Sequence, residues 1–246
     1  MISLEVACGN LASVIAAEKG GAQRIELCSS LGVGGLTPSF GFLEAALACT
    51  DLPVFAMIRP REGDFLYSEQ EVEAMISDIK MARRTGVPGV VFGALTAEGD
   101  VDMTICERLL DAAGPMEATF HRAFDLCRDP YESFDRIRSL AFRRLLTSGQ
   151  APAAPLGVLL IRELVRVAGD GFTVMAGAGV RSDNVQQLVE QTGVSEVHLS
   201  GKQWMDGAMR YRRDHLFMGA SGQQEYSLEI TDSEQIRAVR TLLDRT

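Results

Sequence analysis

Short runs of apolar residues alternate with amphipathic stretches along most of the chain. Clusters of Gly, Pro, Asn, Asp or Ser mark most of the changes from one kind of segment to the other. The apolar runs have the length and composition of β-strands, and the amphipathic stretches between them are typical of helices. We predict eight strands, in residues 3–8, 24–29, 54–60, 90–95, 117–122, 144–149, 173–179 and 196–201.

Two of the helices carry signals for their ends. In residues 68–86, apolar side chains recur at helical spacing behind a capping box formed by Ser68 and Glu71. For the helix before the eighth strand, Ser182 is placed to cap the start and Gly193 to end it.

Strands that alternate with helices predict a parallel sheet, and eight such units in about 200 residues predict closure into a (βα)8 barrel of the TIM type. An open, doubly wound sheet is the alternative, although it normally has fewer strands and a switch point. We assign residues 1–203 to the barrel as a single domain. Residues 204–246 form a C-terminal extension that is expected to pack on the barrel or on a neighbouring subunit.

Composition and charge narrow the class of protein. An apolar fraction of 46% with 23% charged residues is that of an ordinary globular protein, and no apolar run is long enough to span a bilayer. The first residues have no basic segment before their apolar run, so we expect a cytoplasmic protein without a membrane partner. The net charge of −9 argues against attraction to phosphate backbones, and we expect no nucleic-acid partner.

The cysteines do not form a recognisable framework. They are odd in number and widely spaced, with no CxxC pair, which indicates neither a disulfide scaffold nor a structural zinc site. Buried, reduced thiols are the simpler interpretation. The five are Cys8, Cys28, Cys49, Cys106 and Cys127.

In barrels of this type the active site lies at the carboxyl ends of the strands, and here polar residues gather late in several strands. Charges held in a concave, partly dry site have shifted proton affinities suited to acid–base work or ligand capture, whereas the alternative is a structural layer of ion pairs. The residues concerned are Glu5, Glu26, Cys28, Arg59, Arg61, Thr119, His121, Arg122, Asp125, His198 and Ser200.

Roles can be assigned to the most informative of these. Glu5, Glu26 and His121 are the candidate acids and bases, and His121 comes first because it lies at a strand end and titrates near neutrality. Buried carboxylates would need Arg59 or another donor nearby, and His198 is more readily interpreted as structural. The candidates for ligand binding are Arg59, Arg61, Asp125 and His198.

Glycines at the ends of the last strands suggest a second kind of site. Gly177, Gly179 and Gly201 could let backbone N–H groups approach a phosphate, although they could equally serve only tight turns. No lysine lies within a predicted strand, which weakens the interpretation as a Schiff-base aldolase and leaves Lys202 as the lysine still open for it.

Several long motifs occur together and in order: RIELCSSLGVGGLTPSFG, IRPREGDFLYS, TFHRAFD, LTSGQ, MAGAGVR, EVHLSG and MRYR. In this arrangement the chain resembles the copper homeostasis protein CutC family along nearly its whole length. The resemblance implies a TIM-type barrel, a cytoplasmic homo-oligomer and a role in copper handling or tolerance. It therefore implies Cu(I) as a ligand.

The cysteines of the family point to a metal site at the barrel mouth. Cys28, in IELCS, matches one family cysteine, but the other belongs to an E-x-C arrangement in which this chain has Ala7, with Cys8 one residue later. Soft thiolates suit Cu(I), and a displacement by one residue changes faces in a regular strand. Cys28 is thus the metal ligand that the resemblance implies, and Cys8 could join it only if the strand end loosens. Glu62 is a second departure, because the family commonly has Gly there.

Three functions follow from these patterns. The resemblance favours copper homeostasis through Cu(I) binding at the barrel mouth. The ionisable groups favour instead an enzyme of the isomerase or lyase type that acts on a small anionic or phosphorylated metabolite. In the third hypothesis the barrel is a non-catalytic interaction scaffold and its charges are structural.

Overall fold

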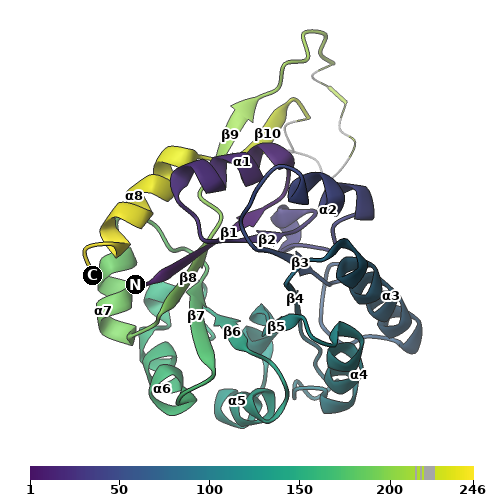
Figure 1. Cartoon of the computed structure of the whole chain (residues 1–246), viewed down its shortest axis with the longest axis vertical. Helices are drawn as coiled ribbons and strands as arrows, with labels where there is room; N and C mark the ends of the chain where they lie inside the picture. Colours follow the sequence, from purple (N-terminus) through teal and green to yellow (C-terminus); the bar gives the residue numbers. More distant parts are fainter. Residues whose placement is uncertain (214, 217, 219–224) are drawn as a thin grey trace.

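The computed structural model describes residues 1–213, 215–216, 218 and 225–246. Among these residues, eight parallel strands close into a barrel in chain order, because β8 pairs with β1 (Figure 1). This confirms the predicted (βα)8 fold and excludes the open sheet. The strands are β1 (Ser3–Cys8), β2 (Arg24–Leu27), β3 (Val54–Met57), β4 (Gly89–Phe92), β5 (Glu117–Phe120), β6 (Arg144–Thr147), β7 (Thr173–Gly177) and β8 (Glu196–Leu199).

Helices surround the barrel, and short 3₁₀ turns follow three of the strands (Figure 1). The α-helices are α1 (Leu11–Gly20), α2 (Phe40–Leu47), α3 (Glu69–Thr85), α4 (Met103–Ala113), α5 (Pro130–Ser139), α6 (Val158–Ala168), α7 (Val185–Thr192) and α8 (Ser233–Leu243). The 3₁₀ turns are η1 (Leu31–Val33), η2 (Arg122–Leu126) and η3 (Ala154–Leu156).

The predicted helix ends are confirmed in two places and corrected in one. The Ser68 and Glu71 capping box begins α3, and Gly193 ends α7 in the left-handed conformation at φ 73°. Ser182 does not cap α7. The amide of Asn184 instead donates to the Arg181 carbonyl in a turn, so the helix begins only at Val185.

Alternation along the strands divides the core into two parts. Leu4, Val6 and Cys8 face outward and join the large apolar cluster between the sheet and the helices. Their neighbours Glu5 and Ala7 therefore face into the barrel, because successive side chains of a strand point to opposite faces. Inside the barrel, a small apolar cluster of Cys28, Phe55, Met57 and Val91 lies among buried polar side chains.

The chain after β8 completes the barrel. An antiparallel hairpin of β9 (Lys202–Asp206) and β10 (Ser227–Thr231) projects from it, and α8 then returns to pack between α1 and α7 (Figure 1). A Cβ on Gly20 would lie 2.5 Å from Ile236 Cβ, so the close contact of α1 with α8 requires glycine there.

The eighth barrel helix thus lies within residues 204–246, and the predicted boundary at residue 203 divides the last βα unit. Packing on a neighbouring subunit stays a prediction. None of the helices in the described part of the chain combines the length and the apolar character needed to cross a bilayer.

Candidate active site at the barrel mouth

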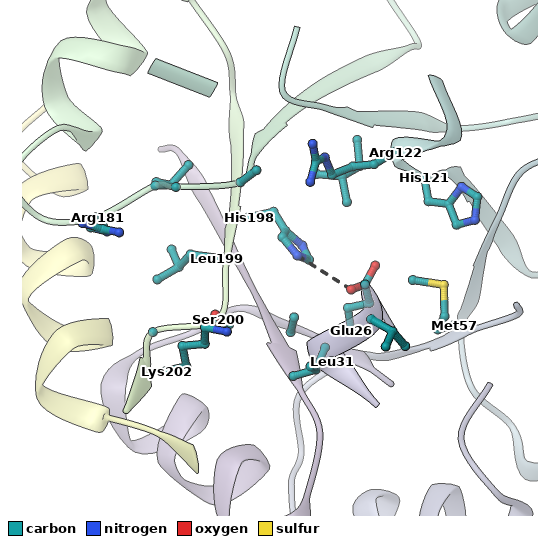
Figure 2. A pocket seen from close by; sticks show the side chains of 18 of the residues that line it. Glu26, Leu31, Met57, His121, Arg122, Arg181, His198, Leu199, Ser200 and Lys202 are labelled. Carbon is teal, nitrogen blue, oxygen red and sulfur yellow. Dashed lines mark ion pairs between the residues drawn. The ribbon is translucent and has the colours of Figure 1, made fainter. Parts of the chain in front are cut away.

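A cavity of about 1030 Å³ opens at the carboxyl ends of the barrel strands. Its wall includes Glu26, Met57, His121, Arg122 and His198, which come from four different strands or the turns that follow them (Figure 2). The structure thus has a cavity at the end of the barrel where the sequence analysis expected the site. Large cavities of this kind, with a few convergent polar groups, are the usual ligand sites of barrels.

Glu5, Glu26 and His198 form the centre of the polar cluster. In the strand register Glu5 pairs with His198 on β8 and with Arg24 on β2, which places the three side chains together inside the barrel. His198 Nδ1 lies 2.7 Å from Glu5 Oε1. On the other side of the ring, His198 Nε2 lies 3.7 Å from Glu26 Oε2, the contact that Figure 2 marks with a dashed line. The imidazole therefore bridges two buried carboxylates.

The cation that compensates Glu5 is Arg24, not the predicted Arg59. Arg24 donates through Nε to Glu5 and through Nη2 to Glu196, and its guanidinium lies 5.1 Å from the centre of the Phe55 ring. Burial would raise the pKa of Glu5, but Arg24 and His198 bring it down to about 2. Glu5 is thus ionised at neutral pH and holds the proton of His198 on Nδ1.

Glu26 differs from Glu5 because, among the described residues, it forms no ion pair with an arginine. Burial raises the pKa of Glu26, and the charge of Glu5 adds to this effect. Burial alone would lower the pKa of His198, but Glu26 and Glu5 raise it above its usual value. Within the described residues Glu26 Oε1 has no hydrogen-bond partner. Glu26 and His198 are therefore adjacent ionisable groups, both with raised pKa values, between which a proton can pass.

His121 does not fit the predicted role of acid or base. Its side chain is buried, and Nδ1 accepts a hydrogen bond of 3.3 Å from the Ala123 amide. Burial, with a smaller effect of Arg59, lowers the pKa of His121 to about 3. The His121 ring is therefore neutral near pH 7 and does not act as an acid or base there. His198, which the sequence analysis favoured less, is the histidine placed to exchange a proton.

The neutral state of His121 predicts a dependence of stability on pH. An unfolded chain binds a proton on this histidine below pH 6.5, whereas the folded chain does so only near pH 3. The free energy of unfolding should therefore fall as the pH drops through this window, by up to about 1.4 kcal/mol per pH unit from this residue. Urea unfolding from pH 7 to 4 should show a shallower loss in His121→Leu, and parallel curves would contradict the assignment.

The two predicted arginines have different positions. Arg59 lines the cavity, but its guanidinium is occupied by the carbonyls of Val33, Gly35 and Gly63, at 2.8 to 3.2 Å. It therefore braces two loops. Arg61 lies outside the cavity lining and binds Glu71 and Asp64, so the expectation that it binds an anion at the mouth is not supported.

The carboxylate of Asp125 is hydrogen-bonded to other groups of the protein. Its carboxylate accepts from Thr147 Oγ1 at 2.5 Å, from the amides of Ser148 and Gln150 at about 3.1 Å, and from Arg122 Nε at 2.7 Å. The expected direct role in ligand binding therefore changes to one of positioning. Arg122, whose side chain is 43% exposed, is the group presented to the cavity.

Two of the three predicted glycines at the ends of the last strands lie at the barrel mouth. Gly179 and Gly201 line the cavity, next to Arg181 and Lys202 (Figure 2 labels both cations). Gly177 does not line it. A Cβ there would lie 2.5 Å from Leu146 Cδ1, which indicates a packing role. Lys202 begins β9, outside the barrel, and its Nζ binds Glu229 at 3.0 Å.

The two candidate copper ligands lie on opposite faces of the sheet. Cys28 Sγ lies inside the barrel, 3.4 Å from Glu26 Oε2, whereas Cys8 packs in the outer apolar cluster. Burial raises the pKa of both thiols, and the charge of Glu26 raises that of Cys28 further. Ala7, which lines the cavity, occupies the inward position that Cys8 lacks. The described residues do not bring the two thiols to one site.

The sequence analysis missed three residues of the buried ion-pair cluster inside the barrel. Arg24, Arg144 and Glu196 lie at the starts of their strands, and Arg144 Nε is 3.3 Å from Glu196. The signal that could have found them is the period of two. Arg24 is two residues before Glu26, and Glu196 is two residues before His198, so each shares a face with a predicted site residue.

Comparison with known proteins places the chain in a family. The CutC family model matches residues 2–203. A CutC family protein of Chromobacterium violaceum is 49% identical over 242 residues, 98% of each chain, and the human copper homeostasis protein cutC homolog is 42% identical over 240 residues, 97% of this chain and 88% of its own. The crystal structure of CutC from Streptococcus agalactiae, 34% identical, covers 81% of this chain and 99% of that one at a TM-score of 0.77. The chain belongs to the CutC family.

Proposed function

We propose that the barrel mouth is an enzymatic site for proton transfer on a small anionic metabolite, with Glu26 and His198 as the exchanging pair. The observation that carries the proposal is the arrangement of Glu26 and His198, which line the cavity, with Glu5 in contact with His198. Glu26 presents Oε1 without a partner in the described part of the chain, and His198 is held by Glu5. A buried base next to an oriented imidazole is typical of acid–base catalysis.

The roles of the three groups follow from their environments. Ionised Glu5, fixed by Arg24, keeps a proton on His198 Nδ1 and holds the ring in one orientation. Glu26 has the raised pKa that burial produces and takes a proton from the substrate. His198 Nε2, 3.7 Å from Glu26, then stabilises or returns that proton. Two ionisable groups with different environments thus serve as base and acid.

Cations around the rim support an anionic substrate. Arg122 and Arg181 line the cavity together with the glycine backbone at Gly179 and Gly201. Asp125 and Ser148 orient Arg122, through contacts of 2.7 and 3.0 Å. A phosphate or carboxylate is the group that such an arginine and nearby backbone amides bind well.

Two variants separate chemistry from binding. We expect Glu26→Gln to lower deuterium uptake from D₂O into a bound metabolite by about 10³-fold. Binding should change only a few-fold, because the rim residues are intact. Arg122→Met should do the reverse and weaken binding. Calorimetric titration with inorganic phosphate and a panel of phosphorylated and carboxylated metabolites, followed by NMR of deuterium uptake, measures both; equal uptake in Glu26→Gln and wild type would refute the proposal.

Cu(I) binding at the mouth is the second candidate function, favoured by the name of the human relative and by one observation. Cys28 lies inside the barrel in a cluster with the thioether of Met57, and soft sulfur donors suit Cu(I). The outward position of Cys8 does not fit a two-thiolate site. The residues present therefore support a single thiolate, Cys28, at this place.

Ala7 offers a direct test of this candidate. A titration with Cu(I) under anaerobic conditions and with a competing chelator should show weak binding in wild type that is lost in Cys28→Ser. Ala7→Cys should raise the affinity by at least about tenfold, because it adds a thiol to the inward face of β1. Tight binding by wild type that survives Cys28→Ser would contradict this account of the site.

The remaining expectations stay predictions. They are the cytoplasmic location and the homo-oligomer implied by the resemblance, and the absence of nucleic-acid and membrane partners. The interaction-scaffold hypothesis predicts that Glu26→Gln and His121→Ala alter stability and leave every ligand assay unchanged.

A further inference from the structure

His121 carries a hydrogen-bond donor that the described residues of the chain leave unused. Because Nδ1 accepts the Ala123 amide, the neutral ring has its proton on Nε2. In the described part of the chain this buried Nε2 has no partner, although the side chain lines the cavity. Burying a donor without a partner is unfavourable, and such groups in folded proteins call for an explanation.

The ring is held rigidly at this place. Its centre lies 4.9 Å from that of Phe65 in an edge-to-face contact, and Phe120 contacts it from a second direction at 6.1 Å. On a third side the backbone of Gly93 is so close that a Cβ would lie 2.9 Å from Nδ1. A donor that packing fixes in advance is the kind of group that stabilises charge formed during a reaction.

The neutral charge state of His121 determines the role that its Nε2–H group can have. Burial and the nearby Arg59 lower the pKa of His121 to about 3, so the ring neither gains a proton near pH 7 nor acts as an imidazolium. A neutral imidazole can donate a strong hydrogen bond to an oxyanion and keep its proton. Its role thus differs from that of His198, which Glu5 and Glu26 favour in the protonated form.

The same cavity wall carries a complementary acceptor. Glu26 Oε1 is likewise buried and has no partner among the residues described. In the view of Figure 2, His121 lies on one side of Glu26 and His198 on the other. An unused donor and an unused acceptor on one cavity match a substrate that presents both a carbonyl oxygen and an acidic C–H group.

We propose that His121 donates from Nε2 to the carbonyl oxygen of a small anionic carbonyl compound, and that the site enolises this compound. The inference rests on the proposed function and specifies its substrate class. Glu26 forms a bond to the α-proton as the C–H bond breaks, and the electron pair forms the C=C bond of the enolate. The C=O electrons move onto oxygen, where the His121 N–H stabilises the negative charge. Return of the proton to the opposite face of the same carbon completes an epimerisation without another reactant. In an α-hydroxy carbonyl compound, return of the proton to the former carbonyl carbon completes an isomerisation, as the hydroxyl proton moves to the former carbonyl oxygen and the C=O bond re-forms at the hydroxyl-bearing carbon.

The first test reads the histidine directly and needs no turnover. Nitrogen-15 NMR of the full chain should show His121 protonated on Nε2, bare on Nδ1 and neutral from pH 8 to 5. Oxalate, a planar dianion shaped like an enolate, should shift the Nε2–H proton downfield as it accepts the hydrogen bond. A proton on Nδ1, or an Nε2–H signal that oxalate does not move, would overturn the inference.

The second test compares substrates matched in charge. Wild type should exchange the α-protons of dihydroxyacetone phosphate or pyruvate for deuterium, and should leave the alcohols glycerol 3-phosphate and lactate unchanged. His121→Leu should lower this exchange by about 10²-fold with little change in Km, and His121→Gln, which keeps an N–H donor, should recover part of it. Far-UV circular dichroism and urea unfolding verify that both variants fold.

The outcomes separate the two proposals. If His121→Leu exchanges at the wild-type rate while Glu26→Gln does not, the acid–base function stands and the role of His121 is refuted. If wild type exchanges neither carbonyl compound, the enolisation proposal falls. The anion-binding measurements with Arg122→Met then test whether the cavity still binds a small anionic metabolite, as the proposed function requires.

Discussion

Replacement of Arg24 by Met should lower the free energy of unfolding by about 3–5 kcal/mol, the cost of leaving one partner of a buried ion pair without the other. Arg24 binds Glu5, which is fully buried, and Glu196, and it packs on Phe55. Met keeps most of the apolar stem, so the loss reports the missing charge and its hydrogen bonds. Urea unfolding at pH 7 measures it.

The dependence of this loss on pH identifies the carboxylate involved. The pKa of Glu5, about 2 in the folded protein against 4.5 in the reference state, is depressed, so its contribution is present above pH 4.5 and is lost as the pH falls toward 2. The difference between wild type and Arg24→Met should accordingly shrink below pH 4.5. A difference that stays constant would mean that packing, and not the charge of Glu5, carries the effect.

A surface arginine provides the matched control. Arg108 also binds two carboxylates, those of Glu69 and Glu73, but all three side chains are substantially exposed. Arg108→Met should cost far less stability than Arg24→Met, because exposed ion pairs are screened by water and salt. The double variant Arg24→Met with Glu5→Gln should regain part of the stability, since the unpaired buried charge is then removed as well.

The barrel could be predicted because its signals are local and repeated. Every barrel strand contains buried apolar residues, and the Ser68 and Glu71 box and the Gly193 stop depend only on neighbours in the chain. The position of Glu26 and His198 at the mouth followed from the fold, because the carboxyl ends of all the strands meet at one end. This part of the site needs no knowledge of side-chain conformation.

The partners of these residues could not be predicted in the same way. Which cation meets Glu5 depends on the stagger between β1 and β2, which places Arg24 beside Glu5 and leaves Arg59 further along the barrel. The loops of the mouth have no periodic pattern either. Arg59 binds carbonyls at Val33 and Gly63, far apart in the sequence, and only the paths of both loops determine that contact.

Asp125 holds the loop that follows β6 and also orients Arg122. Its replacement is the second substitution for which we expect a large effect. Asp125→Ala should lower the free energy of unfolding by about 3 kcal/mol, because Thr147, Ser148 and Gln150 lose the acceptor of their donors. Gln150 has φ 54°, a left-handed conformation that is unfavourable for this residue type and that the contacts with Asp125 help to hold. Thermal and urea unfolding measure the loss.

The same variant should also weaken anion binding, because Arg122 loses the carboxylate that orients it at 2.7 Å. Arg122→Met separates the two consequences: it should weaken binding of inorganic phosphate as much as Asp125→Ala does, but with little loss of stability, since the Arg122 side chain is 43% exposed. Asp125→Asn keeps one acceptor oxygen and should fall between wild type and Asp125→Ala in both measurements. If Asp125→Ala destabilises the fold and binds phosphate as wild type does, Asp125 supports only the loop, and Arg122 finds its position without it.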